Sequence, residues 1–139
     1  MGRLLGLDVG KRRTGLAVTD ALQIACSPHA TVETSKLIEE VMKMHRHEPF
    51  EGIVLGKPLL ILGGTTDSTE VIERVADKLR KAMPSLPIHF VDEGNTSSEA
   101  SHIQVQAGMK KSQRRAKGSL DAIAASLILQ RHLDAQAYG

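Results

Sequence analysis

Residues 4–9 of this chain read Leu-Leu-Gly-Leu-Asp-Val, and residues 10–15 continue as Gly-Lys-Arg-Arg-Thr-Gly. A short aliphatic run that ends at a glycine is typical of a buried β-strand. Its one acid, Asp8, is energetically out of place, because an ionised carboxylate in such a strand is costly unless it is paired or bound to a metal. The basic, glycine-flanked turn beside it indicates a carboxylate that works on a metal or a phosphate.

The composition is that of a globular protein with an aliphatic core. We expect one domain over residues 1–139, which is long enough to bury a core without disulfides. The chain has no Trp, one Tyr and two Phe, which argues against aromatic platforms for stacking bases. The single cysteine, Cys26, excludes an intramolecular disulfide and a thiol-rich metal site.

The expected compartment is the reducing cytoplasm. A lone cysteine fits that setting, and no apolar run in the sequence approaches the roughly 20 residues that a membrane helix needs. The start of the chain also leads directly into the first expected strand, which leaves no room for a secretory segment. We therefore expect no membrane partner.

The order of the elements predicts a mixed α/β sheet. The first two strands should form an antiparallel hairpin, and Pro28 restricts part of the third to a sheet edge or a bend. Later strands alternate with helices, so they should add in parallel by right-handed crossovers. In chain order we expect strands at 3–9, 14–19 and 24–32, a helix at 35–48, a strand at 52–56, a helix at 67–83, a strand at 87–93, and helices at 96–107 and from 119 onwards.

The net charge of +2 names no partner, but the basic residues are clustered. The turn with Lys11, Arg12 and Arg13 suits a phosphate held by backbone N–H groups and side chains, and a plain hairpin turn is an equally good interpretation. The second cluster has no apolar period, so we expect a solvated loop that grips a nucleic-acid backbone. It consists of Lys110, Lys111, Arg114, Arg115 and Lys117.

Three acids are candidates for one site, because functional groups in α/β sheets gather at the carboxyl ends of parallel strands. Asp8 lies near the end of the first strand, Glu93 ends the last strand, and Asp121 is expected in the first turn of the final helix. Simpler interpretations stay open: a salt bridge of Asp8 with Arg13, a solvent-exposed Glu93, and a favourable helix-dipole position for Asp121. However, Asp121 shares a helix face with small apolar residues, which favours an orientation towards the sheet.

A cluster of these carboxylates predicts a site for Mg²⁺ or Mn²⁺, since hard divalent cations prefer oxygen ligands. Two such ions roughly 3.5–4 Å apart stabilise the attacking and leaving oxygens of an in-line phosphoryl displacement. A nuclease needs this arrangement, because a phosphodiester anion repels nucleophiles until its charge is neutralised.

Four blocks of sequence carry a resemblance: LGLDVGKRRTGLAVTD at 5–20, IVLGKPL at 53–59, VDE at 91–93 and KGSLDAIAASLILQ at 117–130. Together they resemble the YqgF/RuvX family of pre-16S rRNA nucleases, also called Holliday junction resolvase-like proteins. The resemblance implies an RNase H-like fold with a five-stranded mixed sheet flanked by helices. It also implies metal-dependent phosphodiester hydrolysis with Asp8, Glu93 and Asp121 as the acidic triad, and maturation of the 5′ end of 16S rRNA.

One block departs from the family, which has Asp-Glu-Arg-Leu-Thr-Thr where residues 92–97 read Asp-Glu-Gly-Asn-Thr-Ser. Gly94 replaces the arginine, so a non-catalytic nucleic-acid-binding factor stays open as an alternative. A nuclease that cuts branched DNA is another, because it needs the same metals and a basic surface. A sugar-kinase or actin-like ATPase is disfavoured, since that fold needs two such lobes. A monomer and a homodimer are both compatible with the sequence.

Overall fold

A mixed five-stranded β-sheet forms the centre of the computed structural model, which describes residues 2–57, 67–92 and 117–138. The strands lie in the order β3-β2-β1-β4-β5 across the sheet. The central strand β1 pairs antiparallel with β2 and parallel with β4, and β5 continues the parallel half. The strands are β1 (Arg3–Val9), β2 (Arg13–Thr19), β3 (Cys26–Glu33), β4 (Phe50–Lys57) and β5 (Ile88–Asp92).

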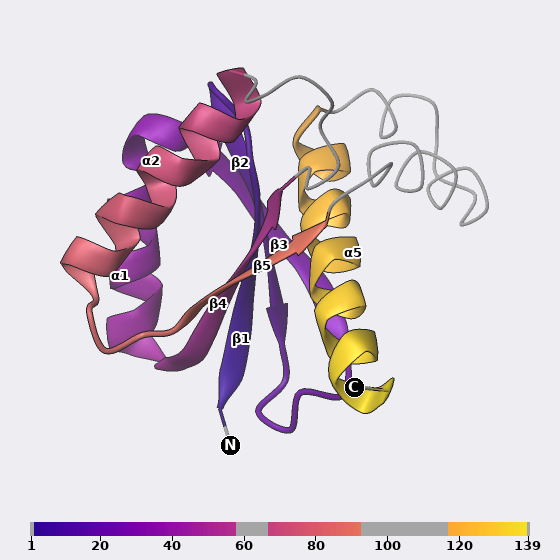
Figure 1. Cartoon of the computed structure of the whole chain (residues 1–139). Coiled ribbons are helices and arrows are strands. Elements are labelled where there is room, and N and C mark those ends of the chain that lie inside the picture. Colours follow the sequence, from indigo (N-terminus) through magenta and orange to yellow (C-terminus); the bar gives the residue numbers. More distant parts are fainter. Residues whose placement is uncertain (1, 58–66, 93–116, 139) are drawn as a thin grey trace.

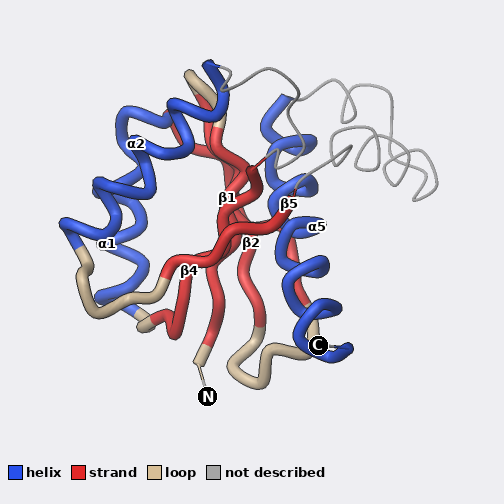
Figure 2. Tube along the Cα trace, viewed as in Figure 1, coloured by secondary structure: helices blue, strands red, loops and turns tan. Residues whose placement is uncertain are grey.

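Helices cover both faces of this sheet (Figures 1 and 2). The short 3₁₀ helix η1 (Thr34–Lys36), α1 (Leu37–His47) and α2 (Asp67–Ala82) belong to one side, whereas α5 (Lys117–Tyr138) lies alone on the other among the described helices. No helix in the described ranges is both long and apolar enough to cross a membrane.

The central strand β1 is buried on both faces because its side chains alternate between two apolar clusters. Leu5 and Leu7 belong to the cluster under α1 and α2, and Leu4 belongs to the cluster under α5. Alternation along a strand has a period of two residues, so Asp8 continues the series that faces α5. The acid that the sequence marked as unusual therefore lies on the α5 side of the sheet.

Most of the expected elements are confirmed. The hairpin of the first two strands is antiparallel, and Pro28 lies in β3, the outermost strand, where the pairing register shifts. Proline is tolerated there because an edge strand has one side without ladder partners. The expected helix at 96–107 and the loop at 58–66 lie outside the described residues.

The expected start of the last helix is wrong by two residues. The helix begins at Lys117 rather than Ser119, so Asp121 is not in its first turn, which holds no acidic residue. Apolar periodicity reveals where a helix starts to pack, and the polar residues before that point already have helical backbone. The helix-dipole interpretation of Asp121 therefore loses its basis, because the dipole's effect fades beyond the first turn.

Two glycines of the sheet let α5 pack closely, on β2 at Gly15 and on β1 at Gly6. A Cβ atom added to Gly15 would lie 1.9 Å from the backbone oxygen of Asp121, and one added to Gly6 would lie 2.4 Å from Cγ of Leu129. Glycine in a strand interior often marks such a close backbone approach. These two glycines therefore set how near α5 comes to the sheet.

A pair of histidines fills the space between β5 and the C-terminal half of α5. The rings of His89 and His132 have centroids 5.0 Å apart, and His132 is 8% exposed. Burial lowers the pKa of His132, and the nearby ring of His89 lowers it further. Both effects favour the neutral form of His132 in the fold.

The substitution Gly15→Ala tests the close packing of α5. The added methyl group collides with backbone, which cannot move aside as a flexible side chain can, so we expect a loss of about 3 kcal/mol or more in the free energy of unfolding. Urea denaturation measures this loss. Gly2→Ala, whose nearest contact would be 3.2 Å from Glu51, should cost less and serves as the control. Equal stabilities of Gly15→Ala and wild type would contradict the packing.

The substitution His132→Gln tests the buried histidine. Because the pKa of His132 in the fold lies below the ordinary value of 6.5, the unfolded chain takes up the proton first as the pH falls. Wild type should lose stability from about pH 6.5 downwards to the lower pKa of the folded state, and His132→Gln should lose less. Urea midpoints across this range measure the difference, with His29→Gln as the control for removing one histidine. Parallel curves for wild type and His132→Gln would contradict the account.

Candidate active site

The candidate site lies at the edge of the sheet where the parallel strands end. Because β1, β4 and β5 run in the same direction, their carboxyl ends meet there. The turn between β1 and β2 is at the same edge, and α5 begins beside it (Figure 1). This is the edge at which α/β sheets place their ligands.

Asp8 is brought to Asp121 by its partner in the neighbouring strand. In the antiparallel ladder Asp8 pairs with Gly15, and directly paired residues present their side-chain positions to the same face of the sheet. The backbone of Asp121 lies on that face of Gly15. Asp8 is only partly buried, so its carboxylate is accessible at this edge. Asp8 on β1 and Asp121 on α5 therefore both lie at the position of Gly15 in the sheet.

One oxygen of Asp121 is buried without a hydrogen-bond donor among the described residues. The side chain is 29% exposed, but its Oδ2 atom is buried and accepts no hydrogen bond from the described residues. Arg13 Nε lies 3.6 Å from Oδ2, which is within salt-bridge range and too long for a hydrogen bond. Burial raises the pKa of Asp121, and the Arg13 guanidinium offsets this only in part. Within the described part of the chain, Oδ2 therefore has a salt bridge and no hydrogen bond.

From the sequence, Arg13 was one possible salt-bridge partner for Asp8. In the structure, Arg13 forms a salt bridge with Asp121. That pairing crosses from the start of β2 to α5, a distance of more than a hundred residues along the chain. A sequence pattern of local charges does not reveal it.

The basic turn is held in place by a threonine that the sequence analysis did not single out. Thr34 donates hydrogen bonds from its hydroxyl to the Gly10 carbonyl (2.6 Å) and from its backbone N–H to the Arg12 carbonyl (2.9 Å). Within the turn, the N–H of Gly10 donates to the carbonyl of Arg13 at 3.0 Å. These bonds fix the turn against η1, so its basic side chains start from a defined backbone.

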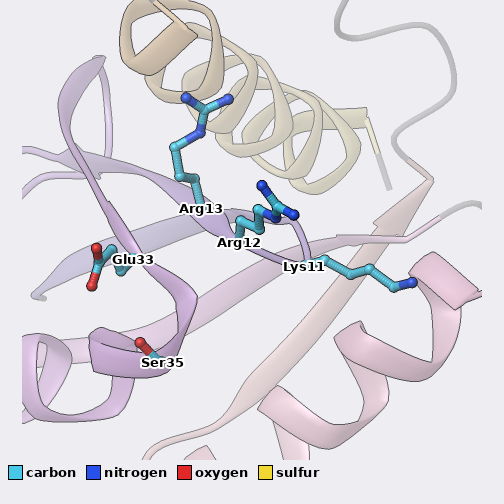
Figure 3. Close-up of a pocket in the computed structure, with 5 residues that line it drawn as sticks. All are labelled: Lys11, Arg12, Arg13, Glu33 and Ser35. Atoms are coloured by element: carbon cyan, nitrogen blue, oxygen red, sulfur yellow. The ribbon is translucent and has the colours of Figure 1, made fainter.

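The exposed side chains of the turn rim an open hollow of about 610 Å³ (Figure 3). In this view Arg13 extends towards α5 and Lys11 extends the other way, towards α2, with Arg12 between them. Glu33 and Ser35 complete the lining. The turn thus carries positive charge on its α5 side and on its α2 side (Figure 3).

Several predicted site residues are not tested by the structure. Glu93 lies one residue beyond the end of β5 and outside the described residues, as do Lys110, Lys111, Arg114 and Arg115. Lys117 begins α5, but its side chain is not described. In the described ranges, no group of three His, Cys, Asp or Glu side chains is placed to hold a metal. The structure therefore brings Arg13 into contact with Asp121, places Asp8 at the neighbouring ladder position and Lys11 in the adjoining turn, and leaves the rest of the site as a prediction.

Gly15 is the position at this site that sequence reasoning missed. Its signal was available, because an isolated glycine inside a strand pattern suggests close approach of another backbone. What approaches it could not be read locally, since the contact comes from residue 121.

The chain is similar to known proteins over almost its whole length. Residues 2–135 match the RuvX family, described as Holliday junction resolvase. The chain belongs to this family. Two curated relatives carry the name "Putative pre-16S rRNA nuclease". The one from Phocaeicola vulgatus is 38% identical over 138 residues, 99% of each chain, and the one from Porphyromonas gingivalis is 42% identical over 134 residues, 96% of this chain and 97% of the relative.

Solved structures of RuvC from Thermus thermophilus resemble this RuvX-family chain in fold. The RuvC bound to a Holliday junction substrate aligns with a TM-score of 0.61 at 12% identity, covering 99% of this chain and 96% of that one. A second structure of Thermus thermophilus RuvC aligns with a TM-score of 0.59 at 13% identity. At such low identity the likeness concerns the fold alone, and it confirms the expected RNase H-like architecture.

The substitution Arg13→Gln tests the described salt bridge. Because the guanidinium lowers the pKa of Asp121, its removal should raise that pKa further above the ordinary value. Carboxyl ¹³C chemical shifts of Asp121, followed through a pH titration, measure the change. Arg12→Gln removes the same charge from the neighbouring position and is the matched control. If both variants gave the wild-type titration of Asp121, the salt bridge would have no electrostatic effect.

Proposed function

We propose that this chain is a metal-dependent endonuclease that processes the 5′ end of pre-16S rRNA, with Asp8, Glu93 and Asp121 as its acidic triad. The observation that carries the proposal is the buried Oδ2 of Asp121, which accepts no hydrogen bond from the described residues and lies beside the strand position of Asp8. A buried polar atom left without a partner is uncommon in folded proteins and calls for an explanation. A cation held by the two carboxylates provides one.

The donor set fits Mg²⁺ or Mn²⁺. Carboxylate oxygens are the ligands that these hard cations prefer, and burial of Asp121 excludes water from one side of the site. Asp8 and Asp121 would hold the ion, and Glu93 would complete the ligands or orient the attacking water. When bound, the ion supplies positive charge that neutralises the phosphodiester and lowers the pKa of water.

The chain's own residues perform the positioning. The contact of α5 with Gly15 fixes the backbone of Asp121 against the strand pair that carries Asp8. Arg13 balances the charge of Asp121 and presents the rest of its guanidinium to a phosphate, which it can bind through charge-assisted hydrogen bonds. Lys11 and Arg12 attract the phosphate backbone to the turn. We assign the same role to Lys110, Lys111, Arg114, Arg115 and Lys117.

RNA is the proposed substrate because the curated relatives are named for pre-16S rRNA. The family description favours a second candidate, cleavage of branched DNA. Both reactions hydrolyse a phosphodiester and need the same triad, so they differ in the nucleic acid that the surface admits. We further propose a single nuclease domain over residues 1–139, acting in the cytoplasm as a monomer or a homodimer.

The substitutions Asp8→Asn and Asp121→Asn test the mechanism. Each keeps the shape of the side chain and removes a charged metal ligand, so we expect a loss of cleavage larger than the roughly 10–100-fold typical of residues that only support a ligand. Asp77→Asn, an exposed acid on α2, is the matched control and should keep wild-type activity.

The assay compares the 5′ region of precursor rRNA, unrelated single-stranded RNA and four-way junction DNA, each with Mg²⁺, Mn²⁺ or a chelator. Preferred cleavage of precursor rRNA that the chelator abolishes is the expected result. Preferred cleavage of junction DNA would identify branched DNA as the substrate in place of RNA. Binding without any cleavage would favour a non-catalytic factor, the alternative that Gly94 leaves open. Unchanged cleavage by Asp8→Asn would overturn the carboxylate mechanism.

A further inference from the structure

A second hollow, of about 300 Å³, lies between α2 and the segment formed by η1 and α1. Its basic side chains are Lys11 from the β1–β2 turn and Arg74 and Lys78 from α2. None of the described residues that line it is acidic. This separates it from the hollow on α1 beside Lys43 and Arg46, where Glu39 is part of the lining. The described lining of the α2 hollow therefore consists of basic, hydroxyl and apolar side chains.

Arg74 and Lys78 are available to a ligand. They are four residues apart on α2, which places them on one face of the helix, and both are exposed. Arg74 lies 3.7 Å from Glu70, but the two side chains are 70% and 57% exposed. A pair so open to solvent contributes little, so a phosphate can take the place of Glu70 at small cost.

The two hollows adjoin at the basic turn. Lys11 and Ser35 line both of them. Because Lys11 extends towards α2 and Arg13 towards α5, the turn links the α2 hollow to the acids at Asp121 (Figure 3). A path of basic side chains therefore runs from the acidic site, over the turn, to Arg74 and Lys78.

We infer that the hollow between α2 and η1–α1 is a second nucleic-acid contact, which holds the phosphate backbone of the substrate strand after that strand has crossed the β1–β2 turn. The inference rests on the proposed function, since it takes the substrate to be a nucleic acid. The spacing of Arg74 and Lys78 along one helix face suits successive phosphates. The apolar floor of Ile38 and Val71 suits the ribose between them. This contact adds binding energy remote from the acids and takes no part in the cleavage step.

The test is binding of single-stranded RNAs of increasing length, measured by fluorescence anisotropy in chelator so that no cleavage occurs. The variant R74Q/K78Q should bind the longer RNAs roughly tenfold more weakly than wild type, and the deficit should vanish for the shortest RNA that still binds. Because two phosphate contacts are lost, the slope of log affinity against log salt should fall by about 1.4.

Two controls isolate the position of the charges. K43Q/R46Q removes the same two charges from α1, in the hollow that contains Glu39, and should bind as wild type does. R74K/K78R keeps the charge and should restore affinity, and thermal unfolding should show that all variants are folded.

The outcomes separate this inference from the proposed function. Equal binding by R74Q/K78Q and K43Q/R46Q would overturn the inference and leave the nuclease proposal standing. Weaker binding confined to R74Q/K78Q, in a protein that cuts nothing when metal is restored, would sustain the inference and defeat the nuclease proposal. A wild-type protein that binds no RNA of any length would overturn the inference.

Discussion

The packing of α5 on Gly15 is the constraint on which the site depends. At this one position the backbone of the helix lies directly on the strand, and the position is where β2 pairs with the one acid of β1. The helix therefore delivers Asp121 to the ladder position of Asp8 without relying on a flexible loop. Sites that are built on strands and helices hold their groups more closely than sites on loops do. A larger residue at Gly15 would lift the helix and separate the acids.

Charge balance is the second physical theme. The carboxyl edge combines carboxylates that prefer a cation with a turn of three basic residues that attracts an anion. The Arg13–Asp121 salt bridge joins these two halves. In the unliganded site it offsets part of the cost of burying Asp121, and with substrate present the same guanidinium can serve a phosphate. The turn itself stays in place because Thr34 binds its carbonyls from η1.

Most of the fold could be predicted because its signals are local. Aliphatic runs, Pro28 and the apolar period of the helices specify the strands, the edge and the helix faces from nearby residues. The start of α5 could not be set in this way, because Lys117 and Gly118 carry no apolar signal yet are helical. In the site, Asp8 stood out by its energetic cost. The salt bridge of Arg13 and the contact at Gly15 were not predictable, since both join segments about a hundred residues apart.

The central claim is that Asp8 and Asp121 share one divalent cation, and paramagnetic broadening by Mn²⁺ tests it most directly. In amide NMR spectra with Mn²⁺ well below one equivalent, the account predicts that signals near Asp8, Gly15 and Asp121 broaden first. It also predicts that this selective broadening disappears in Asp8→Asn while the rest of the spectrum stays that of the folded protein. Selective broadening at another part of the surface, such as the His89–His132 pair, or a pattern unchanged by Asp8→Asn, would contradict the account.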